Sequence, residues 1–114
     1  MNFLKDKLFS AIKAKPKQRG RQQDIANLLE NFPSSSSFAE SYRTLRTNLF
    51  FTAIEKELKS VIVTSSVEGE GKTTTSINLA HTIAQTNKKV LLMDADWRRP
   101  HLSSLYGLRN ENGL

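Results

Sequence analysis

Two glycines, a lysine and three threonines lie together in the stretch "GEGKTTT", residues 69–75. A glycine-rich loop that ends in lysine and hydroxyl side chains is typical of a site that holds the phosphates of a nucleotide. Gly69 and Gly71 allow the backbone to approach the phosphates at φ values that a side chain would disfavour. Lys72 would reach the β- and γ-phosphates, and the hydroxyl group of Thr73 would bind Mg²⁺. The stretch therefore predicts a site for ATP and Mg²⁺.

The loop differs in one position from the pattern G-x-x-x-x-G-K-[ST], because Ser66 stands where the first glycine belongs. A glycine-containing turn with a solvated lysine would also explain the composition. However, the loop follows an apolar run, "SVIV", and precedes a helix-like sequence, which is the context that the pattern requires. We therefore predict a P-loop at residues 66–73. The residues predicted to bind the nucleotide are Gly69, Glu70, Gly71, Lys72, Thr73 and Thr74.

Two aspartates, Asp94 and Asp96, end a second apolar run, "KKVLLMDAD". Side chains two residues apart on a strand point to the same side, and the carboxyl ends of parallel strands meet at one edge of a sheet. We predict that Asp94 holds Mg²⁺ together with Thr73, and that Lys72, Asp94 and Asp96 are catalytic. One carboxylate would organise the metal, and the other would orient an attacking hydroxyl group or accept its proton. The alternative is a polar turn in which the aspartates pair with Arg98 and Arg99.

Several elements must position these groups. Apolar residues with 4-3-4-4 spacing predict a helix that begins near Ser37, in which Ser37 and Glu40 form a capping box. The residues on its apolar face are Phe38, Tyr42, Leu45, Leu49 and Ala53. A buried strand, "SVIVTSS", is predicted next, followed by a helix from Gly71 to Asn87. The inward residues of that second helix are predicted to be Ile77, Ala80, Ile83 and Ala84.

The order of helix, strand, loop, helix and strand contains a βαβ unit. We predict an α/β fold with a doubly wound parallel sheet, of the P-loop NTPase kind, in which the chain ends after the second strand. Residues 1–37 are predicted to be a basic amphipathic arm with a serine-rich linker, and residues 38–114 the N-terminal half of the nucleotide-binding domain.

The composition limits the other possibilities. A chain of 114 residues with 38% hydrophobic content makes at most one small domain. It has no cysteine, which excludes disulfides and cysteine metal sites. It also has no apolar run long enough to cross a membrane, and its charged start lacks the apolar region of a signal peptide. The sequence is thus expected to be cytoplasmic.

The net charge of +6 is concentrated at the N-terminus. Residues 1–21 contain seven of the 17 basic residues and one of the 11 acidic ones, which leaves ten of each in the rest of the chain. The first 14 residues also predict a short amphipathic helix. We expect this arm to meet an anionic membrane surface. No base-reading motif or aromatic platform accompanies it, which argues against nucleic acid.

Three stretches in order resemble one known family: "AESYRTLRTNLFF", "SSVEGEGKTTTSINLA" and "VLLMDADWRRP". They are similar to the bacterial tyrosine kinases of capsule and exopolysaccharide synthesis, the CpsD/CapB/Wzc type. The resemblance implies ATP-dependent tyrosine (auto)phosphorylation that regulates polysaccharide polymerisation and export. It identifies the P-loop as Walker A and the D-x-D strand end as Walker A′. It also implies self-association through Glu40, Arg43 and Arg46, and work beside a membrane-embedded activator or chain-length protein at the inner face of the membrane.

Two alternatives stay open at the level of the sequence. ParA/MinD-like ATPases share the fold, but their loop carries a lysine where this chain has Val67. In these kinases a Walker B strand and a tyrosine-rich tail follow later in the sequence. Neither is found in this chain before its final "NENGL". We therefore expect a truncated form, and the alternative function is a non-catalytic fragment that binds nucleotide or self-associates. A smaller departure is Glu68, which stands where proline is common in the family.

Overall fold

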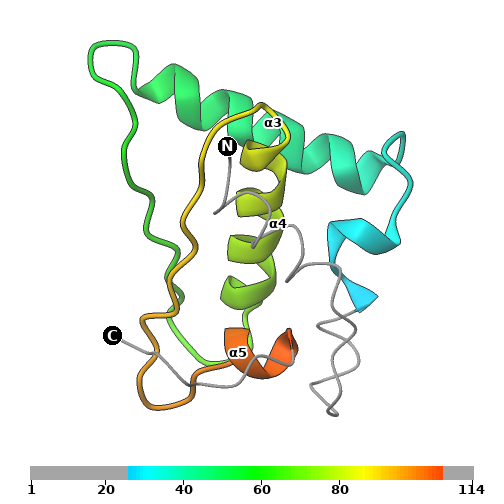
Figure 1. The fold of residues 1–114 in the computed structure, drawn as a ribbon, viewed down its shortest axis with the longest axis vertical. Helices are drawn as coiled ribbons and strands as arrows, with labels where there is room; N and C mark the ends of the chain where they lie inside the picture. Colours follow the sequence, from blue (N-terminus) through cyan, green and yellow to red (C-terminus); the bar gives the residue numbers. More distant parts are fainter. Residues whose placement is uncertain (1–25, 107–114) are drawn as a thin grey trace.

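The computed structural model of the chain describes residues 26–106, so the predicted arm at residues 1–21 lies outside the described residues. The helices are η1 (Leu29–Asn31), α3 (Ser37–Thr52), α4 (Lys72–Ala84) and α5 (Leu102–Leu105). In Figure 1, α3 crosses the carboxyl end of α4, and α5 lies beside the amino end of α4. Across residues 26–106, no helix has the length and apolar character needed to cross a bilayer.

The start of α3 differs from the prediction by one residue. Ser36, with extended backbone angles, is the N-cap, and its hydroxyl oxygen accepts a hydrogen bond of 3.2 Å from the N–H of Ala39. Ser37 is instead the first helical residue, and the Glu40 carboxylate bonds to Arg43 rather than to the start of the helix. The predicted capping box of Ser37 and Glu40 is therefore wrong. Four consecutive serines offer nearly equal caps, so the sequence could not choose between them.

Helix α4 begins at Lys72, one residue after the predicted start at Gly71, and ends at Ala84, three residues before the predicted end at Asn87. Ile77 and Ala80 are buried, which confirms part of the predicted inward face, whereas Ile83 and Ala84 are half-buried. The two most buried side chains are polar: Asn78 and Thr82 are each 1% exposed. The sequence analysis, which looked for apolar residues, did not identify them.

A small core joins α4 to the segments on either side of it. Its buried members are Leu28, Ile77, Leu105 and Tyr106, with Leu92 and Leu102 packed against them. The segment that contains Leu28 is fixed by Asn78: Oδ1 accepts from the N–H of Leu29 at 2.9 Å, and Nδ2 donates to the carbonyl of Asn27 at 2.9 Å. Leu28 and Leu29, which precede the domain boundary predicted at residue 38, are thus held against α4, and the predicted boundary itself stays a prediction.

The two predicted strands, at residues 60–66 and 88–96, lie in segments that are extended rather than in paired strands. Both run on the same side of α4 in Figure 1. No strand is assigned anywhere in residues 26–106, so the predicted parallel sheet stays a prediction. Apolar side chains on these segments are exposed, with Ile62 at 89% and Leu91 at 70%. A parallel sheet is stable when layers cover both faces, and these side chains lack such cover.

Candidate nucleotide-binding site

The backbone of the P-loop has the conformation that its glycines allow. Gly69 has φ of 79° and Gly71 has φ of 86°, both in the left-handed region. A Cβ atom at either position would meet no atom within 4 Å, so the backbone angle, and not crowding, is what favours glycine. Gly71 is also the N-cap of α4 and provides no side-chain cap. The amide groups of the first turn of α4 therefore point toward the region where a phosphate would bind.

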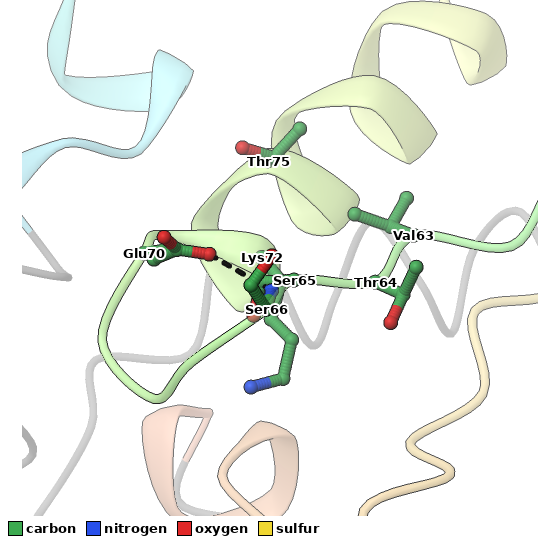
Figure 2. A pocket seen from close by; sticks show the side chains of 7 residues that line it. All are labelled: Val63, Thr64, Ser65, Ser66, Glu70, Lys72 and Thr75. Atoms are coloured by element: carbon green, nitrogen blue, oxygen red, sulfur yellow. Dashed lines mark hydrogen bonds between the residues drawn. The ribbon is translucent and has the colours of Figure 1, made fainter.

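An open pocket of about 650 Å³ lies beside this loop. Its lining residues, drawn in Figure 2, are Val63, Thr64, Ser65, Ser66, Glu70, Lys72 and Thr75. Two of the residues predicted from the sequence, Glu70 and Lys72, thus line one concave surface. Thr73 and Thr74 lie in the first turn of α4 and are half-buried.

Glu70 folds the P-loop back on itself. Its Oε2 atom accepts a hydrogen bond of 3.0 Å from the N–H of Ser66 and one of 3.5 Å from the N–H of Val67. Figure 2 shows the Glu70 side chain directed toward Ser66, while the Lys72 side chain points another way. The Glu70 carboxylate therefore shapes the loop. In the predicted nucleotide site, only the backbone of Glu70 remains available to a phosphate.

Asp94 is engaged by three backbone amides. Its Oδ1 atom accepts from the N–H of Asp96 at 3.0 Å, and its Oδ2 atom accepts from the N–H groups of His101 and Leu102 at 2.9 and 3.1 Å. These bonds close the turn at residues 94–101, which we call the aspartate loop, and they support the start of α5. A carboxylate has about four acceptor positions, so Asp94 keeps about one for the predicted metal.

Asp96 has a different environment. Its Oδ1 atom accepts a hydrogen bond of 3.1 Å from the N–H of Arg99. This bond is the main cause that holds the pKa of Asp96 below its usual range, with further contributions from the N–H of Arg98 and from the positive charges of Lys72 and Arg98. The charge of Lys72 is thus one of the smaller influences on Asp96. The predicted catalytic roles of Lys72, Asp94 and Asp96 stay predictions.

A second link between the two loops involves Glu68. The Arg99 guanidinium forms an ion pair with the Glu68 carboxylate, with Nη1 and Oε2 3.0 Å apart. The alternative in which an aspartate pairs with Arg99 holds only for the backbone. The N–H of Arg99 donates to Asp96, whereas its guanidinium group contacts Glu68 of the P-loop. Glu68, noted in the sequence only as a departure from the common proline, was missed as a contact residue. The sequence did offer one signal for this contact, an acidic residue in the P-loop and a basic residue in the aspartate loop.

The side chains predicted to bind Mg²⁺ would suffice only together with the phosphates of a bound nucleotide. Among residues 26–106, no three histidine, aspartate or glutamate side chains gather to hold a metal. The predicted ligands are the Thr73 hydroxyl and one Asp94 carboxylate. Protein Mg²⁺ sites usually use one or two such oxygen ligands together with phosphates and water, so the residues present suit a metal brought in with the nucleotide.

The predicted self-association residues lie on α3, away from the pocket. Arg43 pairs with the Glu40 carboxylate at 2.7 Å, and its Nη2 donates to the carbonyl of Ser34 at 2.7 Å. Arg46 instead donates to the carbonyl of Thr82 on α4. The structure therefore gives the two arginines different partners.

Comparison with known proteins gives the site its context. Residues 61–112 match the family described as CobQ/CobB/MinD/ParA nucleotide binding domain. The chain is 44% identical over 98 residues to Tyrosine-protein kinase YwqD of Bacillus subtilis, which covers 86% of this chain and 41% of that protein. It is 40% identical over 97 residues to Tyrosine-protein kinase etk of Escherichia coli K12, which covers 85% of this chain and 13% of etk.

A third relative is Tyrosine-protein kinase wzc of Salmonella typhi, 39% identical over 75 residues, which cover 66% of this chain and 10% of wzc. The chain thus spans less than half the length of these relatives. No solved structure is significantly similar to it.

Proposed function

We propose, from the chain's kinship with the tyrosine-protein kinases that include YwqD, etk and wzc, that it supplies the nucleotide-binding part of an ATP-dependent protein-tyrosine kinase. The observation that carries the proposal is the meeting of the P-loop with the aspartate loop. Lys72 opens α4 beside the pocket, and the Glu68–Arg99 ion pair, with Nη1 and Oε2 3.0 Å apart, joins the P-loop to the loop that carries Asp96. A phosphate-binding cation and a carboxylate on an adjoining loop are the parts that phosphoryl transfer to a hydroxyl group requires.

In the proposed mechanism, the γ-phosphoryl group passes in line to a tyrosine hydroxyl. Lys72 and the first-turn amides of α4 would hold the phosphates, with Gly69 and Gly71 permitting the close approach of the backbone. A tyrosine hydroxyl has an unperturbed pKa of about 10, so a neighbouring base is needed to accept its proton near neutral pH. Asp96 is half-buried and its pKa lies below the usual range, so it is ionised and can accept a hydrogen bond from that hydroxyl and orient it. Mg²⁺ would neutralise charge on the phosphates, held by Thr73 and the free position of Asp94.

The proposed setting follows from the resemblance to the kinases of capsule and exopolysaccharide synthesis. The kinase would regulate polysaccharide polymerisation and export, with a membrane-embedded activator or chain-length protein as its partner. It would self-associate through Glu40, Arg43 and Arg46, and it would work in the cytoplasm at the inner face of the membrane. The basic arm at residues 1–21 would contact anionic lipid there.

A second candidate is a nucleotide-binding or self-associating unit without catalysis. The observation that favours it is the exposure of apolar side chains on the two extended segments, such as Ile62 and Leu91, because an incomplete sheet would hold the two loops less rigidly. A ParA/MinD-like ATPase is the third, since the matching domain family includes these proteins by name. The names of the three similar relatives favour the kinase over it.

The P-loop assignment is tested by Lys72→Met. We expect binding of Mg²⁺–ATP to weaken at least about 100-fold, because a charge that faces phosphates contributes several kcal/mol in such sites. The circular dichroism spectrum should not change, since Lys72 is not among the buried core residues. Lys89→Met, at an exposed position outside the pocket, is the matched control and should bind like the parent.

Equal affinity of Lys72→Met and the parent for ATP would contradict the P-loop. Transfer of labelled γ-phosphate to tyrosine, measured on the chain alone and with a full-length relative, then separates the first two candidates. Binding without transfer in both mixtures would favour the non-catalytic one.

A further inference from the structure

Hydrogen bonds within the P-loop fix its shape. The Glu70 carboxylate accepts the N–H groups of Ser66 and Val67, and the Ser65 hydroxyl donates to the carbonyl of Val67 at 2.8 Å. All of these contacts lie within residues 65–70. They therefore determine how the loop turns, and they do not determine where it lies relative to the aspartate loop.

The aspartate loop is tied in the same way. Asp94 accepts three backbone amides, and Asp96 accepts the N–H of Arg99 at 3.1 Å. Both loops lie at the end of α4 that begins with Lys72 (Figure 1). However, the seven residues that line the pocket include none of residues 94–101. The carboxylates of the proposed mechanism thus lie on a separate loop, which contacts with the P-loop have to hold at the pocket.

Glu68 and Arg99 make such a contact. Nη1 of Arg99 lies 3.0 Å from Oε2 of Glu68, and the two residues are 31 positions apart in the chain. The Glu40–Arg43 pair, by contrast, spans three positions of one helix. Because the N–H of Arg99 donates to Asp96 while its guanidinium group donates to Glu68, Arg99 connects Asp96 directly to the P-loop.

The exposure of this ion pair separates its effect on the loops from its effect on stability. The side chains of Arg99 and Glu68 are 65% and 77% exposed. Water and salt screen charges at such positions, so the pair adds little to the free energy of unfolding. It can therefore break while the fold stays intact. Glu68 also stands where the kinases that the chain resembles commonly have proline, so the pair is a feature of this sequence and not of the shared pattern.

We propose that Glu68 and Arg99 are positioning residues whose ion pair holds the aspartate loop at the nucleotide pocket, so that the affinity for Mg²⁺–ATP depends on the pair. The predicted Mg²⁺ ligands explain the dependence, because Thr73 follows the P-loop and Asp94 lies on the aspartate loop. A metal that takes both ligands needs the two loops close together. The identity of the ligand rests on the proposed function, whereas the joining of the loops stands on the contacts of Glu68 and Arg99.

Calorimetric titration with Mg²⁺–ATP tests the dependence in the 114-residue chain. We expect Arg99→Gln to weaken binding about 2- to 5-fold, the range that an exposed pair provides. In a chain that already carries Glu68→Gln, Arg99→Gln should have no further effect, because the pair is already broken. Exchange of the charges, Glu68→Arg with Arg99→Glu, keeps the net charge and should restore the affinity of the parent. Glu57→Gln and Lys89→Gln, at exposed positions outside the pocket, are the matched controls.

The Tm of each variant distinguishes positioning from a merely structural role. We expect every Tm to stay within about 2 °C of the parent. Affinity losses that follow losses of Tm would overturn the proposal. Equal affinity in all variants would also overturn it. An equal loss from Arg99→Gln with and without Glu68→Gln would assign Arg99 to the phosphates directly, and the positioning role would be wrong.

A measurement without nucleotide separates this proposal from the proposed function. The chain has no cysteine and one tryptophan, Trp97, which lies in the aspartate loop and is 85% exposed. Val67 precedes Glu68 and is 62% exposed, so Val67→Cys can carry a nitroxide label, which quenches tryptophan fluorescence only at short range. We expect quenching of Trp97 to fall with added salt and with Arg99→Gln, and to return when the charges of Glu68 and Arg99 are exchanged.

The two measurements fail in different ways. Quenching that ignores both salt and Arg99→Gln would show that the ion pair does not hold the loops together, and it would overturn the proposal. The expected quenching in a chain that does not bind Mg²⁺–ATP would instead reject the proposed nucleotide site, while the ion pair would still be shown to join the loops.

Discussion

Glu68 and Glu70 lie two residues apart in the P-loop, and their carboxylates act on different parts of the site. Glu70 accepts amides of the loop itself, while Glu68 pairs with Arg99 of the aspartate loop. The Glu68–Arg99 pair is exposed, so it contributes at most about 1 kcal/mol to stability. Its effect is geometric: it limits how far the two loops can separate. The P-loop is thus held from within by one glutamate and from outside by the other.

Also at the scale of residues, replacement of Asp94 and replacement of Asp96 should have different effects on the free energy of unfolding. Asp94→Ala removes the acceptor of three amides and should lower the free energy of unfolding by about 1–2 kcal/mol. Asp96→Ala removes one exposed bond and should change stability by less than about 0.5 kcal/mol. Urea denaturation measures both values.

Phosphate transfer provides the second readout for this pair. Asp96→Ala should abolish tyrosine phosphorylation in a complete kinase while ATP still binds. A loss of free energy of unfolding in Asp96→Ala equal to that in Asp94→Ala would show that the hydrogen bonds do not divide the two roles as the structure indicates.

At the scale of the elements, α4 connects the phosphate region to the rest of the structure. Its first turn follows Gly71, its middle holds the segment at residues 27–29 through Asn78, and its last turn is bonded to α3 through Arg46. Polar residues carry out two of these three connections. A helix with an apolar stripe alone could pack in several registers, whereas directional hydrogen bonds from fully buried groups select one.

Asn78→Ala should therefore destabilise the chain more than its size suggests. The N–H of Leu29 would lose its partner inside the structure, and an unsatisfied buried group costs about 1–3 kcal/mol. We expect Tm to fall by about 5–15 °C. Asn48→Ala, at an exposed position of α3, is the matched control and should have little effect. A parent-like Tm for Asn78→Ala would mean that residues 27–29 are held by Leu28 packing alone.

The same elements show what the sequence could predict and what it could not. The start of α4 followed from Gly71 and Lys72, because a left-handed glycine and a phosphate-loop pattern are local features. Burial of Asn78 could not be predicted, because the partner of its side-chain oxygen, the N–H of Leu29, lies 49 residues away, and the backbone carbonyl of Thr82 likewise meets Arg46, 36 residues away. Hydrophobic periodicity carries no information about such distant polar contacts.

The predicted site shows the same limit. The prediction that Lys72 and Asp96 share a site rests on parallel strands whose carboxyl ends meet, and it stays a prediction. The hydrogen bonds of Asp94 to the aspartate loop could not be predicted, because they depend on the turn that residues 94–101 adopt. The sequence analysis therefore gave Asp94 a predicted functional role and missed its structural one.

At the scale of the whole molecule, the two extended segments leave apolar side chains exposed, among them Ile62, Leu91 and Met93. Paired strands need neighbours on their edges and layers on both faces. The matched relatives YwqD and etk are longer than this chain. We therefore expect the predicted sheet to form only with further strands beside these segments.

The basic arm gives a prediction for the complete chain. Liposome co-sedimentation should show binding to vesicles with anionic lipid and not to neutral ones, because each basic residue near an anionic surface contributes about 1 kcal/mol. Added salt should weaken the binding, since it screens the charges. A variant without residues 1–21 should remain in the supernatant. Equal binding of the shortened and complete chains would refute the role of the arm.

Burial of Tyr106 limits the number of phosphates that a tyrosine kinase can add to the folded chain. The chain contains two tyrosines, and Tyr106 is 7% exposed, in the core beside Leu28 and Ile77. Burial, with a smaller contribution from the charge of Glu30, raises the pKa of its hydroxyl well above the usual range. A kinase acting on the folded chain would therefore find one acceptor, Tyr42, at the half-buried edge of α3. Incorporation beyond one phosphate per chain would then report unfolding of the core rather than a second site of modification.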